Sequence, residues 1–404
     1  MSGSDYTDIT TCVACGNSKL QTTLDLGYQP LANDFLEPGS VLDTYPLKLM
    51  LCLTCFHSQL SIAVDPSRLF RDYAYVSGTS ETLSNFFEKF VARLIGEFGN
   101  SSKVLDIGSN DGTFLSKFKK TGWNYIGVDP AINLVSESAA KGVVTIPTFF
   151  DQRIASVLAN NFDVVVAMNV FAHTHNPLEI LLGIKRCLSE NGKAFIQTSQ
   201  ADMFTTGEFD TVYHEHISFF NVRSMKALLQ RAGLSLSNVS IVPIHGGSYL
   251  WEIEHSKQNQ PDLERELEEV RMGIYSTELY DTFSQLAIKK VHEVQEVIAE
   301  YRNQQFDVVS YGAAAKGNTF INFAQLDFDY IFDDTPQKIG RLSPAGGCIV
   351  SNPEFLSRIQ KPLLIVIPAW NFGSEILQRI RRIRSNPQDM YLTYFPTTEL
   401  HPVI

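Results

Sequence analysis

Four of the six cysteines form two Cys-x-x-Cys pairs near the amino end of the chain, Cys12 with Cys15 and Cys52 with Cys55. Each pair places two thiols on one short turn, and two such turns can close a tetrahedral shell around a zinc ion. Because cysteine then fills every ligand position, the spacing predicts a structural zinc site; disulfides or a redox dithiol are the alternatives. We expect His57, two residues after Cys55, to be exposed.

The segment from Asp106 to Gly112, D-I-G-S-N-D-G, follows a short apolar run. Gly108 and Gly112 let the backbone approach a bound molecule, while Asp106 and Asp111 carry carboxylates at the carboxyl end of the predicted strand. With two acids and no base, this loop suits a cationic ligand better than a phosphate. An ordinary strand-to-helix turn is the alternative interpretation.

The spacing D-x-G-x-x-x-G resembles the first motif of Rossmann-like S-adenosylmethionine (AdoMet) methyltransferases. Asp129 ends the next predicted strand, about 20 residues after the loop, where an acid usually binds the ribose hydroxyls of a nucleoside. Phe150 and Asp151 are candidates for contact with adenine. The predicted cofactor-binding residues are Asp106, Gly108, Asn110, Asp111, Gly112, Asp129, Asp151 and Asn169.

A third reactive stretch is Tyr213-His214-Glu215-His216. Its histidines lack the i, i+4 spacing of a helical zinc site, and on an extended segment both would point away from Glu215. A general base and a hydrogen-bonded structural histidine remain open as interpretations. His173 follows another apolar strand and is a candidate for polar contact with the acceptor.

Regularly alternating strand and helix patterns from Ser102 onward predict a doubly wound α/β sheet that positions these residues. The expected strands cover residues 103–107, 123–129, 143–146, 162–167, 192–198, 234–243 and 247–255, and an amphipathic helix precedes them at 81–98. Charged helices from Pro261 to about Asn303 lead to a second α/β unit that starts at Phe306. There Lys316, at a helix amino end, is a candidate phosphate contact, and the arginines between 379 and 384 are expected to be solvated.

Composition limits the class of protein. A length of 404 residues predicts two or three domains, and a net charge of -11 opposes binding to nucleic acid or anionic membranes. The longest apolar runs are far shorter than the roughly 20 residues that span a bilayer. The amino end lacks the basic and apolar regions of a secretory signal, so we expect a cytoplasmic protein.

Taken together, these segments resemble the sugar-nucleotide C-methyltransferase family, which makes 3-C-methyl deoxysugars from nucleotide-linked 4-keto sugars. The resemblance follows the family's order over nearly the whole chain. Its matching parts are the four cysteines and residues 75–81, 106–113, 169–173, 213–220, 245–248 and 311–319.

The resemblance implies a zinc-binding lobe at 1–72, an AdoMet domain at 73–256 and a carboxyl-terminal Rossmann-like domain at 257–404 that binds the nucleotide. It implies that His216 is the base, with the other predicted catalytic residues close to the sugar. The predicted catalytic residues are His216, Tyr213, Glu215, His173 and Tyr75, and the predicted substrate-binding residues are Asn169, Lys316 and Ser248.

The implied reaction starts at C3 of the sugar, where the 4-keto group acidifies the proton. A base removes this proton, and the enolate carbon then attacks the methyl group of AdoMet. We expect a monomer or weak homo-oligomer that binds a nucleotide-linked keto sugar and no nucleic acid or membrane. An O- or N-methyltransferase and a non-catalytic AdoMet- and zinc-binding module are the competing interpretations.

Overall fold

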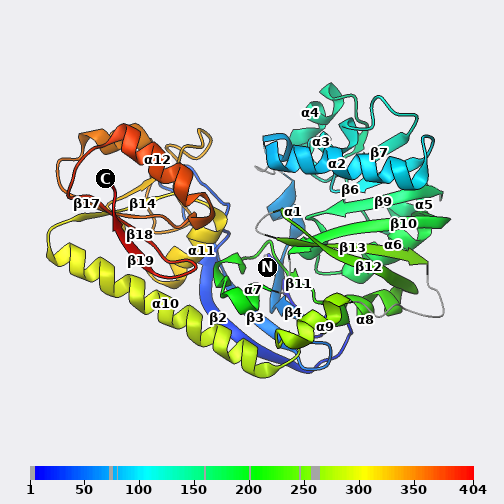
Figure 1. The fold of residues 1–404 in the computed structure, drawn as a ribbon, viewed down its shortest axis with the longest axis horizontal. Coiled ribbons are helices and arrows are strands. Elements are labelled where there is room, and N and C mark those ends of the chain that lie inside the picture. The colour runs from blue at the N-terminus through cyan, green and yellow to red at the C-terminus, as the bar shows by residue number, and fades with distance from the viewer. Residues whose placement is uncertain are drawn as a thin grey trace. The chain divides into compact units, whose positions relative to one another are not determined.

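The computed structural model describes residues 5–71, 76–79, 81–158, 161–199, 202–244, 247–255 and 264–404. It divides into two compact units. The first combines Met1–Gln21, Met50–Ala201 and Glu215–Tyr275, and the second combines Thr22–Leu49, Asp202–His214 and Ser276–Ile404. Figure 1 follows the chain through both. The division into three domains stays a prediction.

The first unit contains a seven-stranded sheet in the order β12-β13-β10-β9-β6-β7-β8. Strands β6 to β10 are parallel, and β13 is antiparallel to both β10 and β12. The strand order reverses between β6 and β9, and open α/β sheets bind ligands at the carboxyl side of such a switch point. The strands are β6 (Lys103–Ile107), β7 (Asn124–Val128), β8 (Thr145–Ile146), β9 (Phe162–Met168), β10 (Leu188–Ser199), β12 (Leu234–Val242) and β13 (Ser248–His255).

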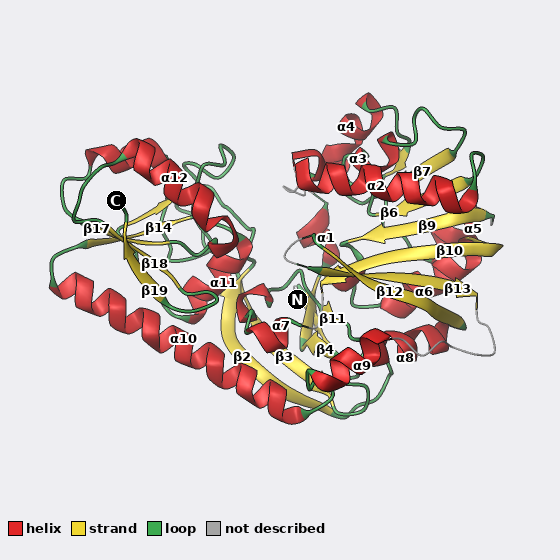
Figure 2. Cartoon of the chain, viewed as in Figure 1, coloured by secondary structure: helices red, strands yellow, loops and turns green. Residues whose placement is uncertain are grey.

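Helices cover both faces of this sheet, which confirms the predicted doubly wound architecture (Figure 2). On one face, Phe87 and Phe90 of α2 pack with Phe114 and with Phe195 of β10 in one aromatic core. α2 spans Glu81–Phe98, as predicted. The remaining helices of the layers are α3 (Thr113–Ser116), α4 (Val135–Ala140), α5 (Gln152–Leu158), α6 (Pro177–Cys187) and α8 (Val222–Ala232), followed by α9 (Glu264–Arg271).

The amino-terminal residues form small sheets. β1 (Tyr6–Asp8) pairs with β5 (Ile62–Val64), and α1 (Pro66–Phe70) follows. In the first unit, β4 (Ser58–Leu60) pairs antiparallel with β11 (Ser218–Phe219). β2 (Leu20–Pro30) and β3 (Thr44–Cys52) are two longer neighbouring strands.

The second unit contains a six-stranded sheet in the order β16-β15-β14-β17-β18-β19, parallel except for β19. This confirms the second α/β unit. Its elements are α7 (Met203–Thr206), α10 (Thr277–Asn303), β14 (Asp307–Tyr311), α11 (Ala315–Phe323), β15 (Tyr330–Phe332), β16 (Val350–Ser351), β17 (Leu363–Val366), α12 (Gly373–Ile383), β18 (Met390–Thr393) and β19 (Glu399–Pro402). No described helix is long and apolar enough to cross a membrane.

Three expectations from the sequence are wrong. His57 is fully buried, with its ring centroid 4.6 Å from that of Phe220, because the chain after Cys55 turns straight into β4. Arg384 is also buried and forms an ion pair with Asp389, so it does not belong to a solvated basic face. The strand expected at 143–146 is reduced to two residues.

We predict that Arg384→Met destabilises the protein by about 3 kcal/mol, because it leaves the carboxylate of Asp389 buried without its cation. Arg384 also donates to the carbonyls of Leu356 and Lys361, so the loss extends to two loops. Urea denaturation measures the change. Lys361→Met, which breaks an exposed ion pair with Asp307, is the matched control and should cost less than about 1 kcal/mol. Equal costs for the two variants would contradict the prediction.

Candidate cofactor, metal and acceptor sites

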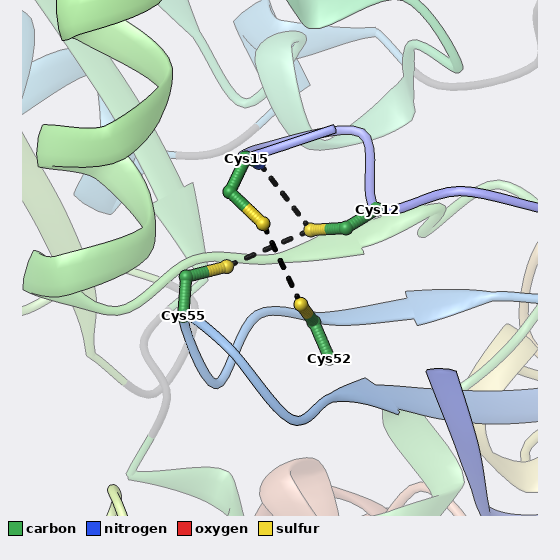
Figure 3. A group of neighbouring side chains, drawn as sticks. All are labelled: Cys12, Cys15, Cys52 and Cys55. Atoms are coloured by element: carbon green, nitrogen blue, oxygen red, sulfur yellow. Dashed lines mark hydrogen bonds between the residues drawn. The ribbon is translucent and has the colours of Figure 1, made fainter. Parts of the chain in front are cut away.

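The four paired cysteines meet at one point (Figure 3). The Sγ atoms of Cys12 and Cys55 are 3.6 Å apart, as are those of Cys15 and Cys52, and all four sulfurs lie within 4.8 Å of one another. A zinc ion with Zn–S bonds of about 2.3 Å requires sulfur separations of about 3.8 Å in a tetrahedron. A disulfide would need about 2.05 Å. The geometry therefore fits zinc and excludes paired disulfides.

The chemistry of the four thiols points the same way. Hydrogen bonding with Cys52 and burial raise the pKa of Cys12 to about 12, and hydrogen bonds with Cys12 and Cys52 raise the pKa of Cys55 well above its usual value. Hydrogen bonds from Cys12 and Cys55 lower the pKa of Cys52, so one thiolate is stabilised at the expense of its neighbours. Four thiolates so close together need a cation, which zinc supplies. Arg231 holds the first turn from outside by donating to the carbonyls of Val13 and Ala14.

Two carboxyl groups lie at the carboxyl ends of β6 and β7. Asp106 is buried, and no described residue donates a hydrogen bond to its carboxyl group or forms an ion pair with it. Burial, together with the nearby Asp129, raises the pKa of Asp106 well above its usual value. Burial also raises the pKa of Asp129, although its carboxylate accepts the backbone N–H groups of Asn110 (2.7 Å) and Ala131 (2.8 Å). A cationic ligand would stabilise the ionised form of Asp106.

The side chains of Asn110 and Asp111 form hydrogen bonds within the protein. The Oδ1 atom of Asn110 accepts the backbone N–H of Ser77 at 2.9 Å, and Asp111 accepts that of Gly78 at 3.1 Å. Asp111 also forms an ion pair with Lys141 and is fully buried. We call these contacts the loop latch. The predicted cofactor role of both residues remains untested, but their polar atoms already hold the turn before α2.

The close approaches in the loop explain its glycines. A Cβ on Gly108, which has φ +74°, would lie 2.1 Å from the side chain of Val170. A Cβ on Gly112 would lie 2.8 Å from Ser138 Oγ. Asn169, at the end of β9, also has a left-handed backbone (φ +57°), and its N–H donates to the carbonyl of Gln197. The switch point between β6 and β9 is therefore tightly packed.

His173 and His216 come together in the first unit. Their ring centroids are 5.2 Å apart, and Phe70 and Phe219 flank them. Burial lowers the pKa of His173 to about 4, so this imidazole is neutral near pH 7. Two imidazoles side by side, one held neutral, can bind and transfer a proton.

The other residues of the reactive stretch are arranged by a turn, so the expectation that both histidines share one direction is wrong. His214 is buried beside Tyr45 in the second unit, where burial lowers its pKa to about 4. Glu215 is buried and Tyr213 half-buried. Within the described residues this stretch contributes to no group that could hold a metal. The predicted catalytic residue Tyr75 lies outside the described residues.

The remaining predicted contacts are already hydrogen-bonded. Ser248 is buried and donates to the carbonyl of Ile244 at 3.0 Å. Asp151 accepts the N–H of Ile154 at the start of α5 and pairs with Arg153. In the second unit, Lys316 pairs with Glu208 at 3.1 Å and lies 4.8 Å from the ring centre of Trp370.

Sequence reasoning missed the partners of these side chains. Lys141 and Glu208 belong to no recognisable motif and have polar neighbours in the sequence. Nothing in the sequence therefore connects Lys141 with Asp111 or Glu208 with Lys316. Gln197 was missed as well, although a polar residue near the end of an otherwise apolar strand is a signal that could have been read.

Three family models match the chain. A zinc binding domain matches residues 12–70, a methyltransferase domain matches 80–239, and a C-methyltransferase C-terminal domain matches 243–396. The first match contains all four clustered cysteines, and the second contains the glycine loop and β6 to β10.

The chain is also similar to individual proteins over all or part of its length. C-methyltransferase NovU from Streptomyces niveus is 26% identical over 391 residues, which is 93% of this chain and 93% of that protein. A tRNA U34 carboxymethyltransferase from Dichelobacter nodosus is 30% identical over 135 residues, which is 30% of this chain and 40% of that protein. A crystal structure of magnesium protoporphyrin IX methyltransferase from Synechocystis PCC 6803 with bound SAM covers 43% of this chain and 79% of that chain, at 13% identity and a TM-score of 0.34.

We predict about one zinc ion per chain, lost in Cys55→Ser together with several degrees of Tm, because three thiols and a hydroxyl bind zinc poorly. Cys348→Ser is the control: its side chain donates to the carbonyls of Phe328 and Gly346, which a hydroxyl can also reach. Metal content by mass spectrometry and thermal denaturation measure both effects. Full zinc content in Cys55→Ser would contradict the assignment.

We predict that Lys141→Met destabilises the protein by about 2 kcal/mol, because the carboxylate of Asp111 stays buried with only N–H partners. The exposed Lys120 gives the control, Lys120→Met, which should change the free energy of unfolding by less than about 0.5 kcal/mol. Chemical denaturation compares the two. If the variants are equally stable, the loop latch does not depend on its cation.

Proposed function

The chain belongs to the AdoMet-dependent C-methyltransferases that carry a zinc-binding domain, and we propose that it methylates C3 of a nucleotide-linked 4-keto-deoxysugar. The observation that carries the proposal is the pair of imidazoles at His173 and His216. Methylation at an oxygen or nitrogen uses an existing lone pair and releases an acidic O–H or N–H proton, whereas methylation at a keto-sugar carbon first requires a base to remove a much less acidic C–H proton. An imidazole titrates in the range that suits such a base.

In this proposal His216 is the base, and the neutral His173 or Tyr213 hydrogen-bonds the oxygen that becomes negative in the enolate. A fixed hydrogen-bond donor at that position lowers the barrier because it stabilises the charge that develops on the oxygen. Glu215 and Tyr75 complete the same pocket in the family that the sequence resembles. The low pKa of His173 supports its role, since a neutral imidazole keeps one N–H donor and one acceptor.

AdoMet supplies an activated methyl group, and the residues at the carboxyl ends of β6 and β7 fit it. Asp106 has a buried carboxyl group that lacks a cationic partner among the described residues, as binding of an ammonium group requires. Asp129 keeps lone pairs beside its two N–H donors and can accept the ribose hydroxyls. The glycine turn at 108–112 contains no lysine or arginine that would compete for Asp106.

We assign the nucleotide part of the substrate to the second unit, at Lys316. This residue opens α11, whose first turn contains no acid and whose N-cap residue, Ala314, gives no side-chain hydrogen bond. A phosphate there would replace the carboxylate of Glu208 as the partner of Lys316. The ion pair thus marks a position where the protein accommodates negative charge.

The proposal is tested by incubating the protein with AdoMet and a panel of 4-keto-6-deoxysugars linked to thymidine, uridine, guanosine or cytidine diphosphate. Mass spectrometry should find a gain of one methyl group in one member, and NMR should place it on carbon. Methylation on oxygen would replace the proposal by an O-methyltransferase. No methyl transfer to any member would reject this substrate class.

We predict that His216→Asn lowers turnover by a factor of about 10² to 10⁴, the usual contribution of a general base, while AdoMet still binds with unchanged affinity. Calorimetry measures the binding. Solvent deuterium exchange at C3, run with S-adenosylhomocysteine in place of AdoMet, isolates the deprotonation and should be lost in the same variant. His175→Asn, at an exposed histidine two residues after His173, is the control. Wild-type exchange rates in His216→Asn would reject His216 as the base.

A further inference from the structure

We propose that the carboxamide of Gln197 binds the acceptor and donates a hydrogen bond to the carbonyl oxygen that becomes negative when the carbon acid loses its proton. This inference rests on the proposed function and adds a residue to its site. It starts from the side chain's burial, its lack of partners and its position on β10.

Gln197 is fully buried, and neither its Oε1 nor its Nε2 atom has a hydrogen-bond partner among the described residues. A carboxamide offers two donors and an acceptor, and leaving such groups buried and unpaired is costly. Its neighbour Thr198 shows the ordinary solution, because Trp251 Nε1 donates to Thr198 Oγ1 at 2.9 Å. An unpaired amide beside a satisfied hydroxyl indicates a group that pairs with something other than the protein.

The side chain points to the face of the sheet that carries the cofactor acid. β10 runs without a register shift from Lys193 to Gln197, so Gln197 shares its face with Phe195, which packs on Phe90 of α2. Phe195 lies in one row with Val166 of β9 and Asp106 of β6. Gln197 is therefore two residues closer to the carboxyl end than Asp106, on the same face.

Its place across the sheet separates it from the cofactor residues. The candidate AdoMet acids lie on β6 and on β7, whereas β10 lies beyond β9 on the other side of β6. Neighbouring strands are about 4.8 Å apart. Across the sheet, Gln197 is therefore about 10 Å from the position in the same row at the end of β6, and about 14 Å from Asp129. A ligand group that reaches Gln197 therefore belongs to the acceptor side of the site.

Its backbone connects it to that side as well. The carbonyl of Gln197 accepts the N–H of Asn169, the left-handed residue that starts the turn to His173. The backbone of Gln197 thus lies at the foot of the segment that carries His173, one of the two paired imidazoles. A carboxamide does not titrate, so it cannot serve as the base; as a fixed neutral donor it suits an oxygen on which charge develops.

The test uses the full-length protein and the keto sugar that the wild type methylates. Gln197→Met keeps the volume and removes every polar atom, and Thr198→Val is the matched control on the other face of the same strand. Four quantities are measured for each: kcat and KM, the AdoMet dissociation constant, the rate of deuterium exchange at C3 with S-adenosylhomocysteine, and Tm.

We expect Gln197→Met to lower kcat and the exchange rate together, by about 100-fold, with unchanged AdoMet affinity, because removing one oxyanion donor usually costs 10²–10³ in kcat. Its Tm should equal or exceed that of the wild type, since a buried unpaired amide is removed. Thr198→Val should do the opposite, with a lower Tm because the Trp251 indole N–H loses its partner, and with wild-type turnover.

Three outcomes would overturn the inference. If Gln197→Met turns over within threefold of the wild type, the amide serves a buried water or nothing at all, while the proposed function stands. If only KM rises and the exchange rate is unchanged, Gln197 contacts the substrate away from the reacting oxygen. If the wild type methylates no keto sugar, the proposed function and this inference fail together.

Discussion

A buried charge needs a partner, and the three acids near the carboxyl edge of the first sheet differ in whether the protein supplies one. Asp111 is neutralised by Lys141, Asp129 accepts two backbone N–H groups, and Asp106 has no partner among the described residues. A satisfied acid holds the structure together, while an unsatisfied one is stabilised by a ligand. The same requirement applies to polar groups: Thr198 has a hydrogen-bond partner, whereas the carboxamide of Gln197 has none among the described residues. It also applies to the four clustered thiols, which a metal ion would neutralise.

The histidines follow the same rule through their protonation. His57, His173 and His214 are held neutral by burial, which lowers the pKa of each well below its usual value. They therefore add no positive charge to a chain with a net charge of -11. In the proposed reaction this matters at His173, because a cationic imidazole beside His216 would oppose protonation of the base.

Much of the fold could be predicted because its patterns are local. The bounds of α2, the run of β9 and the glycine loop at 106–112 depend on residues close in sequence, and each Cys-x-x-Cys pair is a local motif. What failed depends on distant residues. Nothing near Arg384 reveals that Asp389 and two carbonyls will enclose it, and nothing near Asp111 reveals Lys141. Hydrophobic periodicity does not encode such polar pairings.

The ion pair of Lys316 with Glu208 has a consequence for selectivity under the proposed function. A carboxylate fixed beside a lysine behaves as a competing anion of constant, high effective concentration. A sugar without phosphate would have nothing to exchange for it, and a monophosphate would gain little. A diphosphate linkage carries two neighbouring negative charges and competes better for Lys316. Glu208 would therefore favour the binding of nucleotide-activated sugars over that of the free sugars.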